Sequence, residues 1–365
     1  MNTKKDIVPA LTTHPGEIIQ DELDSRKMNQ AELAKLIGIE KTQLNEIIKG
    51  KRSINADLAL LLEKAMGIDA EYWINAQKIY ELDTARIDEK NQGRLQSIEE
   101  WNILSPNIPI SFLKKHKFIS GDPMLDVDIV KSIYGINHIE QLAATYASSV
   151  YIRYKKTNTD KVDRINVIGW TKLISYLGQQ QQVNTFHIKH MDSVISQLRK
   201  LITENKNIKE KAIAILADAG IKLVYHKNAE KCPIDGVCLW SGKNPLIGMS
   251  LRHSRLDNFA FTLFHELGHV YLHLVNNPEA QFIDDLEDSS NKEDQEEIEA
   301  NNFAADSLIA PENWEYFISN QNRMQDDFAI SFAKEVGIHP IVVKGRLKHH
   351  FQNYTHRTRI ENNIN

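Results

Sequence analysis

The five residues His265-Glu-Leu-Gly-His269 lie inside a long apolar segment and constrain the fold more than any other feature of the chain. Phe, Leu, Val, Tyr and Ala surround them throughout Leu256–Val275, which predicts a helix buried on most of its sides. In a helix the two histidines are offset by about 40° and lie on one face. Because burying two histidines and a glutamate without partners is costly, the pattern favours a Zn²⁺ site. Glu266 would then be the general base that takes a proton from a water activated by the metal.

The third metal ligand must come from elsewhere in the chain. The metzincin pattern needs Gly and His at the positions where this chain has Leu272 and Val275, so that class is excluded. A helix expected from about residue 292 to 310 offers four glutamates, and spacing alone does not choose between Glu296 and Glu299. On a helical wheel Glu299 shares a side with Asp306. The acids of this helix therefore supply the candidate third ligand.

Short apolar runs bounded by Gly, Pro and Asn precede the histidine helix. They are Ile221–Tyr225, Gly236–Trp240 and Leu246–Leu251, and each has the length and composition of a β-strand. We expect a small sheet that leads into the helix, with Leu246–Leu251 at its edge. An extended peptide could pair with such an edge.

Residues 14–83 have the pattern of several short amphipathic helices, with glycines at positions suited to helix ends. The second and third helices have the length and order of a helix-turn-helix, in which the second helix of the motif enters the major groove of DNA. Four residues of that helix would meet base edges: Lys41, Thr42, Gln43 and Asn45. Three that follow would meet phosphates: Lys49, Lys51 and Arg52.

Residues 41–52 form a basic patch, although the net charge of the whole chain is -5. Residues 14–83 carry nine Lys and Arg against thirteen acids, whereas residues 41–52 carry four against one. The net charge argues against non-specific coating of nucleic acid, and the local footprint favours a homodimer that reads one double-stranded operator.

Composition narrows the setting of the protein. A chain of 365 residues predicts two or three domains, and two cysteines are typical of a reducing compartment. No apolar run approaches the length of about 20 residues that a membrane span needs, and residues 1–18 lack the apolar core of a secretory signal. We therefore expect a cytoplasmic protein without a membrane partner.

The N-terminal residues closely resemble the Xre-family helix-turn-helix of HigA/VapI-type antitoxins. The resemblance rests on the HPGE opening, Q-x-x-L-A in the second helix, the G-K-R-x-I turn and the closing Y-W-x-x-x-Q-x-x-Y-x-L helix. It implies operator binding, usually as a dimer and often with autorepression, and a HigB/RelE-like toxin or another protein as partner.

The C-terminal residues resemble the ImmA/IrrE-type metallopeptidase family. FTLFHELGHVYLH, followed by EANNFAADSLIAP, carries the likeness. Transferred position by position, it implies His265, His269 and Glu299 as ligands and Glu266 as general base. Asp306 is our separate candidate for a carboxylate that orients a ligating histidine. His273, about 80° from His265 in a regular α-helix, is interpreted as a partly buried structural residue.

Together these features predict a multidomain, mainly α protein with a small α+β domain. We expect a five-helix helix-turn-helix domain over 1–83, a helical connecting region over 84–214, a zincin-like peptidase domain over 215–321, and a helical and basic tail over 322–365. The predicted function is that of a DNA-binding regulator or antitoxin whose zinc-dependent peptidase domain hydrolyses a protein partner. The alternative is a non-proteolytic HigA-like antitoxin or repressor whose metal domain only senses or binds a partner.

Overall fold

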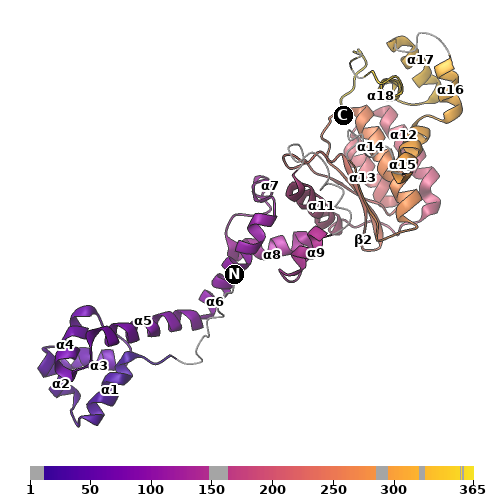
Figure 1. Cartoon of the computed structure of the whole chain (residues 1–365). Coiled ribbons are helices and arrows are strands. Elements are labelled where there is room, and N and C mark those ends of the chain that lie inside the picture. The colour runs from indigo at the N-terminus through magenta and orange to yellow at the C-terminus, as the bar shows by residue number, and fades with distance from the viewer. Residues whose placement is uncertain (1–11, 148–162, 285–294, 320–324, 354, 356) are drawn as a thin grey trace. The chain divides into compact units, whose positions relative to one another are not determined.

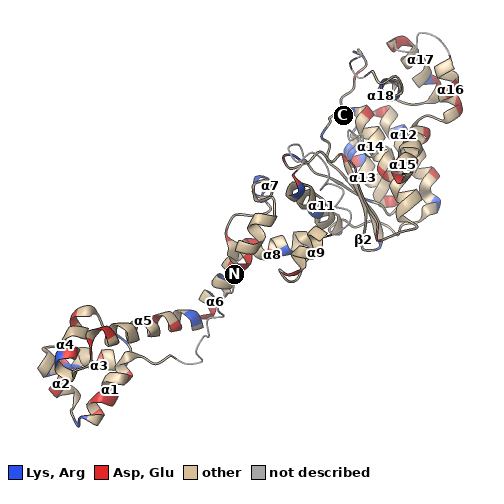
Figure 2. Cartoon of the chain, viewed as in Figure 1, with Lys and Arg blue, Asp and Glu red and all other residues tan. Residues whose placement is uncertain are grey.

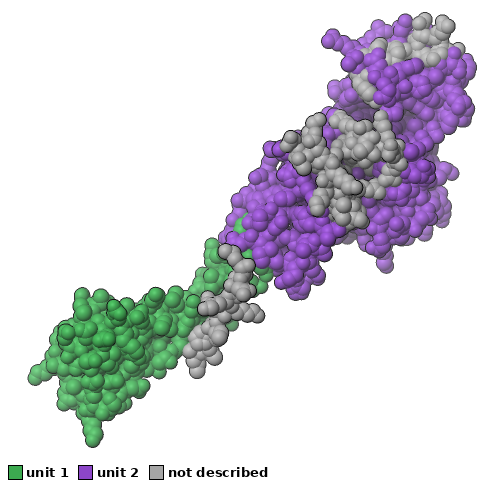
Figure 3. Space-filling view, in the orientation of Figure 1, with its two compact units in different colours: residues 1–101 green, residues 102–365 purple. Residues whose placement is uncertain are grey.

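The computed structural model describes residues 12–147, 163–284, 295–319, 325–353, 355 and 357–365 (Figure 1). The chain divides into two compact units, residues 1–101 and residues 102–365 (Figure 3). Each unit is described by itself below.

The N-terminal unit is a helical bundle. Its elements are α1 (Pro15–Ser25), α2 (Gln30–Ile37), α3 (Lys41–Ile48), α4 (Ala56–Met66), α5 (Ala70–Ile87) and most of α6 (Glu89–Leu104). Local capping sets several of these ends. The side chains of Asn29 and Glu32 form a reciprocal capping box at the start of α2, and Gly38 ends that helix in the left-handed conformation. The predicted helical N-terminal fold is confirmed.

The segment His14-Pro-Gly-Glu17 packs the start of α1 against the end of α3. The Gly16 N–H donates to Nδ1 of the buried His14 at 2.8 Å. A Cβ atom on Gly16 would lie 2.3 Å from the carbonyl oxygen of Ile47, so only glycine allows the two helices to approach this closely. Leu23, Leu33 and Leu44 fill the core that this contact closes.

The second unit begins with helices and continues into a sheet. Before the sheet lie η1 (Ser105–Asn107), α7 (Ile110–Lys115), α8 (Pro123–Tyr134), α9 (Gln141–Ala147), α11 (Arg164–Gln179), η3 (Ile188–His190), α12 (Met191–Glu204) and α13 (Ile208–Asp218). This confirms the helical character expected for the connecting region. The sequence also indicates a short extended stretch at Val150–Tyr154, and these residues lie outside the part of the chain that the structure describes.

Within the described residues the sheet has four strands in the order β1-β3-β2-β4. They are β1 (Lys222–Tyr225), β2 (Gly236–Ser241), β3 (Asn244–Met249) and β4 (Gln281–Asp284). β3 pairs parallel with β1 and antiparallel with β2, and β2 also pairs antiparallel with β4. The prediction that Leu246–Leu251 forms an edge is therefore wrong. β3 is an interior strand, as its unbroken burial from Pro245 to Met249 requires.

The histidine helix packs against the sheet and the C-terminal helices. α14 (Leu256–Gly268) contacts α15 (Gln295–Leu308), α18 (Pro340–His350), β2 and β3, while α16 (Pro311–Ser319) and α17 (Asp326–Val336) complete the described elements. α14 continues directly into η4 (His269–Leu274), a π-helix. Among the described residues, no helix is both long and apolar enough to cross a membrane.

Candidate metal centre

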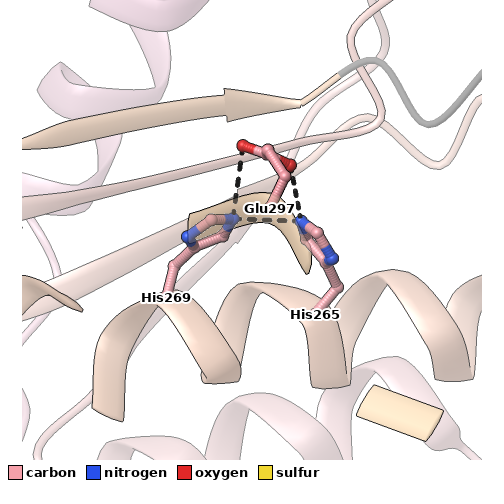
Figure 4. A group of neighbouring side chains, drawn as sticks. All are labelled: His265, His269 and Glu297. Carbon is pink, nitrogen blue, oxygen red and sulfur yellow. Dashed lines mark hydrogen bonds and ion pairs between the residues drawn. The ribbon is translucent and has the colours of Figure 1, made fainter. Parts of the chain in front are cut away.

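The two motif histidines lie on consecutive turns of α14 and η4, and their side chains have no solvent exposure. Their Nε2 atoms face each other at 3.0 Å. The carboxylate of Glu297 approaches from α15, with its oxygens 3.5 Å from Nε2 of His265 and 3.7 Å from Nε2 of His269 (Figure 4). Three side chains from two helices thus converge on one buried point.

The register of α15 explains why Glu297 occupies this position. Ala300, Ala304 and Leu308 are buried at helical spacing, and Glu297 lies on the same face, three residues before Ala300. Glu299, which the family pattern had suggested as the ligand, lies on a different side, and 45% of its side chain is exposed. The structure therefore brings Glu297, and not Glu299, to the histidine pair.

The donor set fits a zinc ion. Ligand atoms of His265, His269 and Glu297 all lie within 4.8 Å of one another, and all three residues are buried. Two nitrogens bound at the usual Zn–N distance in a tetrahedral site lie roughly 3.3 Å apart, close to the separation found here. Two histidines and one glutamate leave a fourth position open, which is typical of catalytic zinc sites.

A hydrogen bond orients the first histidine. Nδ1 of His265 lies 3.0 Å from Oδ1 of Asn301, an atom that can only accept. Nδ1 of His265 therefore carries the proton, and the lone pair of Nε2 faces the other ligands. Glu297 and Asn301 are both residues of α15, so one helix supplies a ligand and the group that orients another ligand.

Glycine at the start of β2 makes room for the proposed general base. A Cβ atom on Gly236 would lie only 1.7 Å from Oε1 of Glu266. Glu266 has no solvent exposure, so its carboxylate packs directly over the backbone of β2. The preceding residue, Asp235, is itself buried and forms a two-point ion pair with Arg252, which holds this end of the strand.

The edge strand β4 covers the second histidine. The ring of Phe282 stacks on the ring of His269, with centroids 4.3 Å apart and planes at 15°. The strand β4 was not predicted from the sequence. The side chain of Phe282 screens one face of the His269 ring from water.

Two other residues named from the sequence have different partners. Nε2 of His273 lies 3.1 Å from Oε2 of Glu299, and Gln295 also donates to the Glu299 carboxylate. The Gln295 hydrogen bond, followed by that of His273, lowers the pKa of Glu299. Asp306, our candidate for orienting a ligand, instead pairs with Arg346 at 3.4 Å.

In the N-terminal unit most of the predicted DNA contacts are available to solvent. Lys41, Thr42, Lys49, Lys51 and Arg52 are exposed, and Gln43 is half-buried. Figure 2 shows Lys and Arg interspersed with Asp and Glu across α1–α5. Asn45, also half-buried, donates instead to Gln30 at the start of α2, and Gln30 donates in turn to Gln20. These bonds hold α2 in register with α1 and α3.

Comparison with known proteins matches the two ends of the chain to two different families. Residues 19–73 match a family model described as helix-turn-helix, and residues 217–348 match a peptidase model described as IrrE N-terminal-like domain. Virulence-associated protein I of Dichelobacter nodosus is 38% identical over 88 residues, which cover 24% of this chain and 80% of that protein. Virulence-associated protein A' of the same organism is 41% identical over 70 residues, 19% of this chain and 61% of that protein.

Solved structures are also similar to part of the chain. An addiction module antidote protein of the HigA family from Coxiella burnetii is 38% identical, with 22% of this chain and 88% of that chain covered and a TM-score of 0.21. These relatives cover less than a quarter of the chain described here.

Proposed function

We propose that this chain, which belongs to the helix-turn-helix family of virulence-associated protein I and carries an IrrE N-terminal-like domain, is a DNA-binding regulator of the antitoxin type with a zinc-dependent peptidase. The observation that carries the peptidase half is the meeting of Glu297 with His265 and His269 in one buried site that also contains Glu266.

In this proposal His265, His269 and Glu297 hold zinc. When bound, zinc would polarise the carbonyl of the scissile peptide and activate a water molecule. Glu266 accepts the proton from that water and later donates it to the leaving amine. Gly236 lets the Glu266 carboxylate lie against β2, and Phe282 excludes water from one side of His269. The chain's own contributions are thus ligand placement, a positioned proton acceptor and partial desolvation.

The peptidase proposal is tested with zinc-loaded full-length protein, unfolded casein and a pool of quenched fluorescent peptides. We expect cleavage that a zinc chelator stops. Glu266→Gln should keep zinc but lower the rate by about 10²–10⁴-fold, the usual contribution of a general base. Glu296→Gln, on the exposed side of α15, is the matched control and should retain the rate.

The outcome that contradicts this proposal is also defined. If the protein binds zinc and cleaves neither probe, or if Glu266→Gln cleaves as fast as the unmodified chain, hydrolysis through Glu266 is wrong. Zinc binding without hydrolysis would favour the non-proteolytic antitoxin whose metal domain senses or binds a partner.

The DNA-binding half of the proposal rests on α3. Its exposed Lys41 and Thr42 and half-buried Gln43 lie at the N-terminal end of the helix, which is the end that meets base edges in helix-turn-helix proteins. Lys49 and Lys51, just beyond the helix, supply positive charge for the phosphate backbone.

Binding is measured on duplex DNA from upstream of the protein's own coding sequence, with unrelated duplex as reference. Gln43→Ala should reduce the binding free energy for the specific duplex by about 1–3 kcal/mol. Lys49→Ala should weaken binding to both duplexes and reduce the salt dependence of that binding. Lys78→Ala, an equal charge change on the exposed face of α5, should change neither. Equal loss for Lys78→Ala and Lys49→Ala would contradict binding through α3.

Three finer points complete the proposal. We propose that two copies occupy one operator, that a HigB/RelE-like toxin or another protein is the partner, and that the protein acts in the cytoplasm. The first follows from the short basic segment, which suits one half-site. The mass of the protein–operator complex tests it: one chain per operator would contradict the dimer.

A further inference from the structure

His273 lies next to the proposed metal centre, four residues after His269, although in a regular α-helix it would be offset by about 80° from His265. The segment that carries it, His269–Leu274, is a π-helix, and the Val275 N–H donates to the carbonyl of Val270 five residues earlier. A π-helix has more residues per turn than an α-helix, so each residue advances by a smaller angle. The offset between His269 and His273 is therefore smaller than the roughly 40° of an α-helix, and the two rings are aligned more closely. Their Nδ1 atoms lie 3.1 Å apart.

This contact uses the edge of the His269 ring that faces away from the other ligands. Nε2 of His269 faces Nε2 of His265 and the carboxylate of Glu297, whereas Nδ1 of His269 faces His273. The ring of His269 thus separates His273 from the metal ligands. His273 is placed to act on His269 and not on the ion.

Resting on the proposed zinc site, we propose that His273 and Glu299 form a positioning relay that fixes the ring and proton position of His269. The proton positions follow from the contacts. A neutral His269 that binds metal through Nε2 must carry its proton on Nδ1 and donate it to Nδ1 of His273. His273 then carries its own proton on Nε2, which lies 3.1 Å from Oε2 of Glu299. A carboxylate can only accept, so Glu299 sets the direction of both hydrogen bonds.

The relay gives each ligand histidine its own partner. Asn301 accepts from His265, and His273 accepts from His269. Such partners hold the ring and raise the basicity of the ligand, and losing one typically weakens metal binding about 10–100-fold. The relay also accounts for Glu299, an acid near the site that lies outside the group of converging ligand atoms.

Two substitutions of His273 separate a hydrogen-bonding role from a packing role. His273→Phe keeps a ring beside Phe282, whose centroid is 5.4 Å from that of His273, but cannot accept a hydrogen bond. His273→Gln loses the ring and keeps an oxygen that can accept from His269. Zinc affinity is measured by competition with a chromogenic chelator, and Co²⁺ loading gives the visible absorption spectrum of the site.

We expect His273→Phe to bind zinc about 10–100-fold more weakly than the unmodified chain and to change the Co²⁺ spectrum. The zinc affinity of His273→Gln should lie between those of His273→Phe and the unmodified chain. Glu299→Ala removes only a partly exposed side chain, so it tests the relay if His273→Phe does not fold. It should weaken zinc binding about tenfold. Glu296→Gln, exposed on the same helix, should leave both readings unchanged.

The relay is overturned if His273→Phe or Glu299→Ala binds zinc as tightly as the unmodified chain, or if His273→Phe binds at least as tightly as His273→Gln. A different result marks failure of the underlying site. If the unmodified chain binds no zinc, the proposed metal centre itself is wrong, and the relay has no function to support.

Discussion

Gly236 determines where the carboxylate of Glu266 can lie. The residue has no side chain, and the carboxylate occupies the space that a Cβ atom would need. This contact joins the first residue of β2 to a residue in the last turn of α14, 30 positions further along the chain. The proposed general base is therefore positioned by the backbone of the sheet as well as by its own helix.

Gly236→Ala should remove hydrolysis while preserving zinc. A Cβ atom 1.7 Å from Oε1 forces Glu266 to move, and its three nearest atoms all belong to Glu266 and not to the three converging residues. We expect zinc content near that of the unmodified chain and a casein cleavage rate near that of Glu266→Gln. Gly93→Ala, in α6 with nothing within 4 Å of its Cβ position, is the control and should cleave normally. Normal cleavage by Gly236→Ala would contradict this placement of Glu266.

The choice between Glu297 and Glu299 shows what sequence can and cannot settle at the residue scale. The H-E-x-x-H spacing on an apolar helix was sufficient to place His265 and His269 on one face. Glu297 falls in helical register with Ala300 and Ala304, three and seven residues before them, but Glu293 and Glu296 also lie at helical spacing from these alanines, so spacing alone does not select Glu297. A family pattern read without that register points to the neighbouring acid. Asn301 carried no comparable signal.

At the element scale, the contact between α14 and α15 assembles the centre. A Cβ atom on Gly268 would lie 3.0 Å from Cα of Ala300 and 3.2 Å from its carbonyl oxygen. Small residues thus let the two helices approach closely, and α15 presents Glu297 and Asn301 to the histidines. The Gly and Ala of H-E-L-G-H and E-A-N have a packing role in addition to the chemistry of their neighbours.

Gly268→Ala should therefore weaken zinc binding without removing any ligand. The added methyl group pushes α15 away by a few tenths of an ångström, and both Glu297 and Asn301 move with it. We expect zinc affinity to fall about tenfold, as for loss of an orienting contact. Gly93→Ala, also a helical glycine but in open space on α6, should leave the affinity unchanged. Equal affinities for the two variants would mean that the helix contact does not set the ligand geometry.

Element boundaries were predictable where local chemistry sets them. Gly38 and Gly67 end α2 and α4 in the left-handed conformation, at the kind of helix-end position expected for glycines from the sequence. The strand order of the sheet and the existence of β4 were not predictable from the sequence, because strand pairing depends on residues far apart in the chain. The π-helix at His269–Leu274 also has no local signature in this sequence, so the contact between His273 and His269 was not predictable.

At the scale of the whole molecule, the last residues of the chain are tied into the second unit. Asp326 pairs with Lys344, whose side chain is fully buried, and accepts hydrogen bonds from Thr358 and the Arg359 N–H. Burial alone would raise the pKa of Asp326, but the bonds from Arg359, Lys344 and Thr358 outweigh it and hold the pKa at about 2. The ionised carboxylate therefore stabilises the fold.

The sign of this effect predicts how stability changes in acid. The pKa of Asp326 is lower in the folded chain than in the unfolded chain, so its contribution is present above about pH 4 and is lost as pH falls toward 2. Asp326→Asn should lower the free energy of unfolding by about 3 kcal/mol at pH 7 and flatten its decline below pH 4. Urea denaturation of the full chain measures both.

Asp327→Asn is the control for that experiment. Asp327 pairs with Arg359 on the surface, with both side chains more than two-thirds exposed, so its removal should cost less than about 1 kcal/mol. Equal losses for the two variants, or an unchanged acid profile for Asp326→Asn, would contradict the role given to the buried Lys344 pair.

We infer that His265, His269 and Glu297 form a zinc site, and a comparison of two glutamate variants tests this assignment. Zinc content of the full chain is measured after equilibration with excess Zn²⁺ and removal of loosely bound metal. We predict one zinc ion in the unmodified chain, loss of that ion in Glu297→Ala, and retention with weaker affinity in Glu299→Ala. Loss of zinc in Glu299→Ala together with full retention in Glu297→Ala would contradict the site.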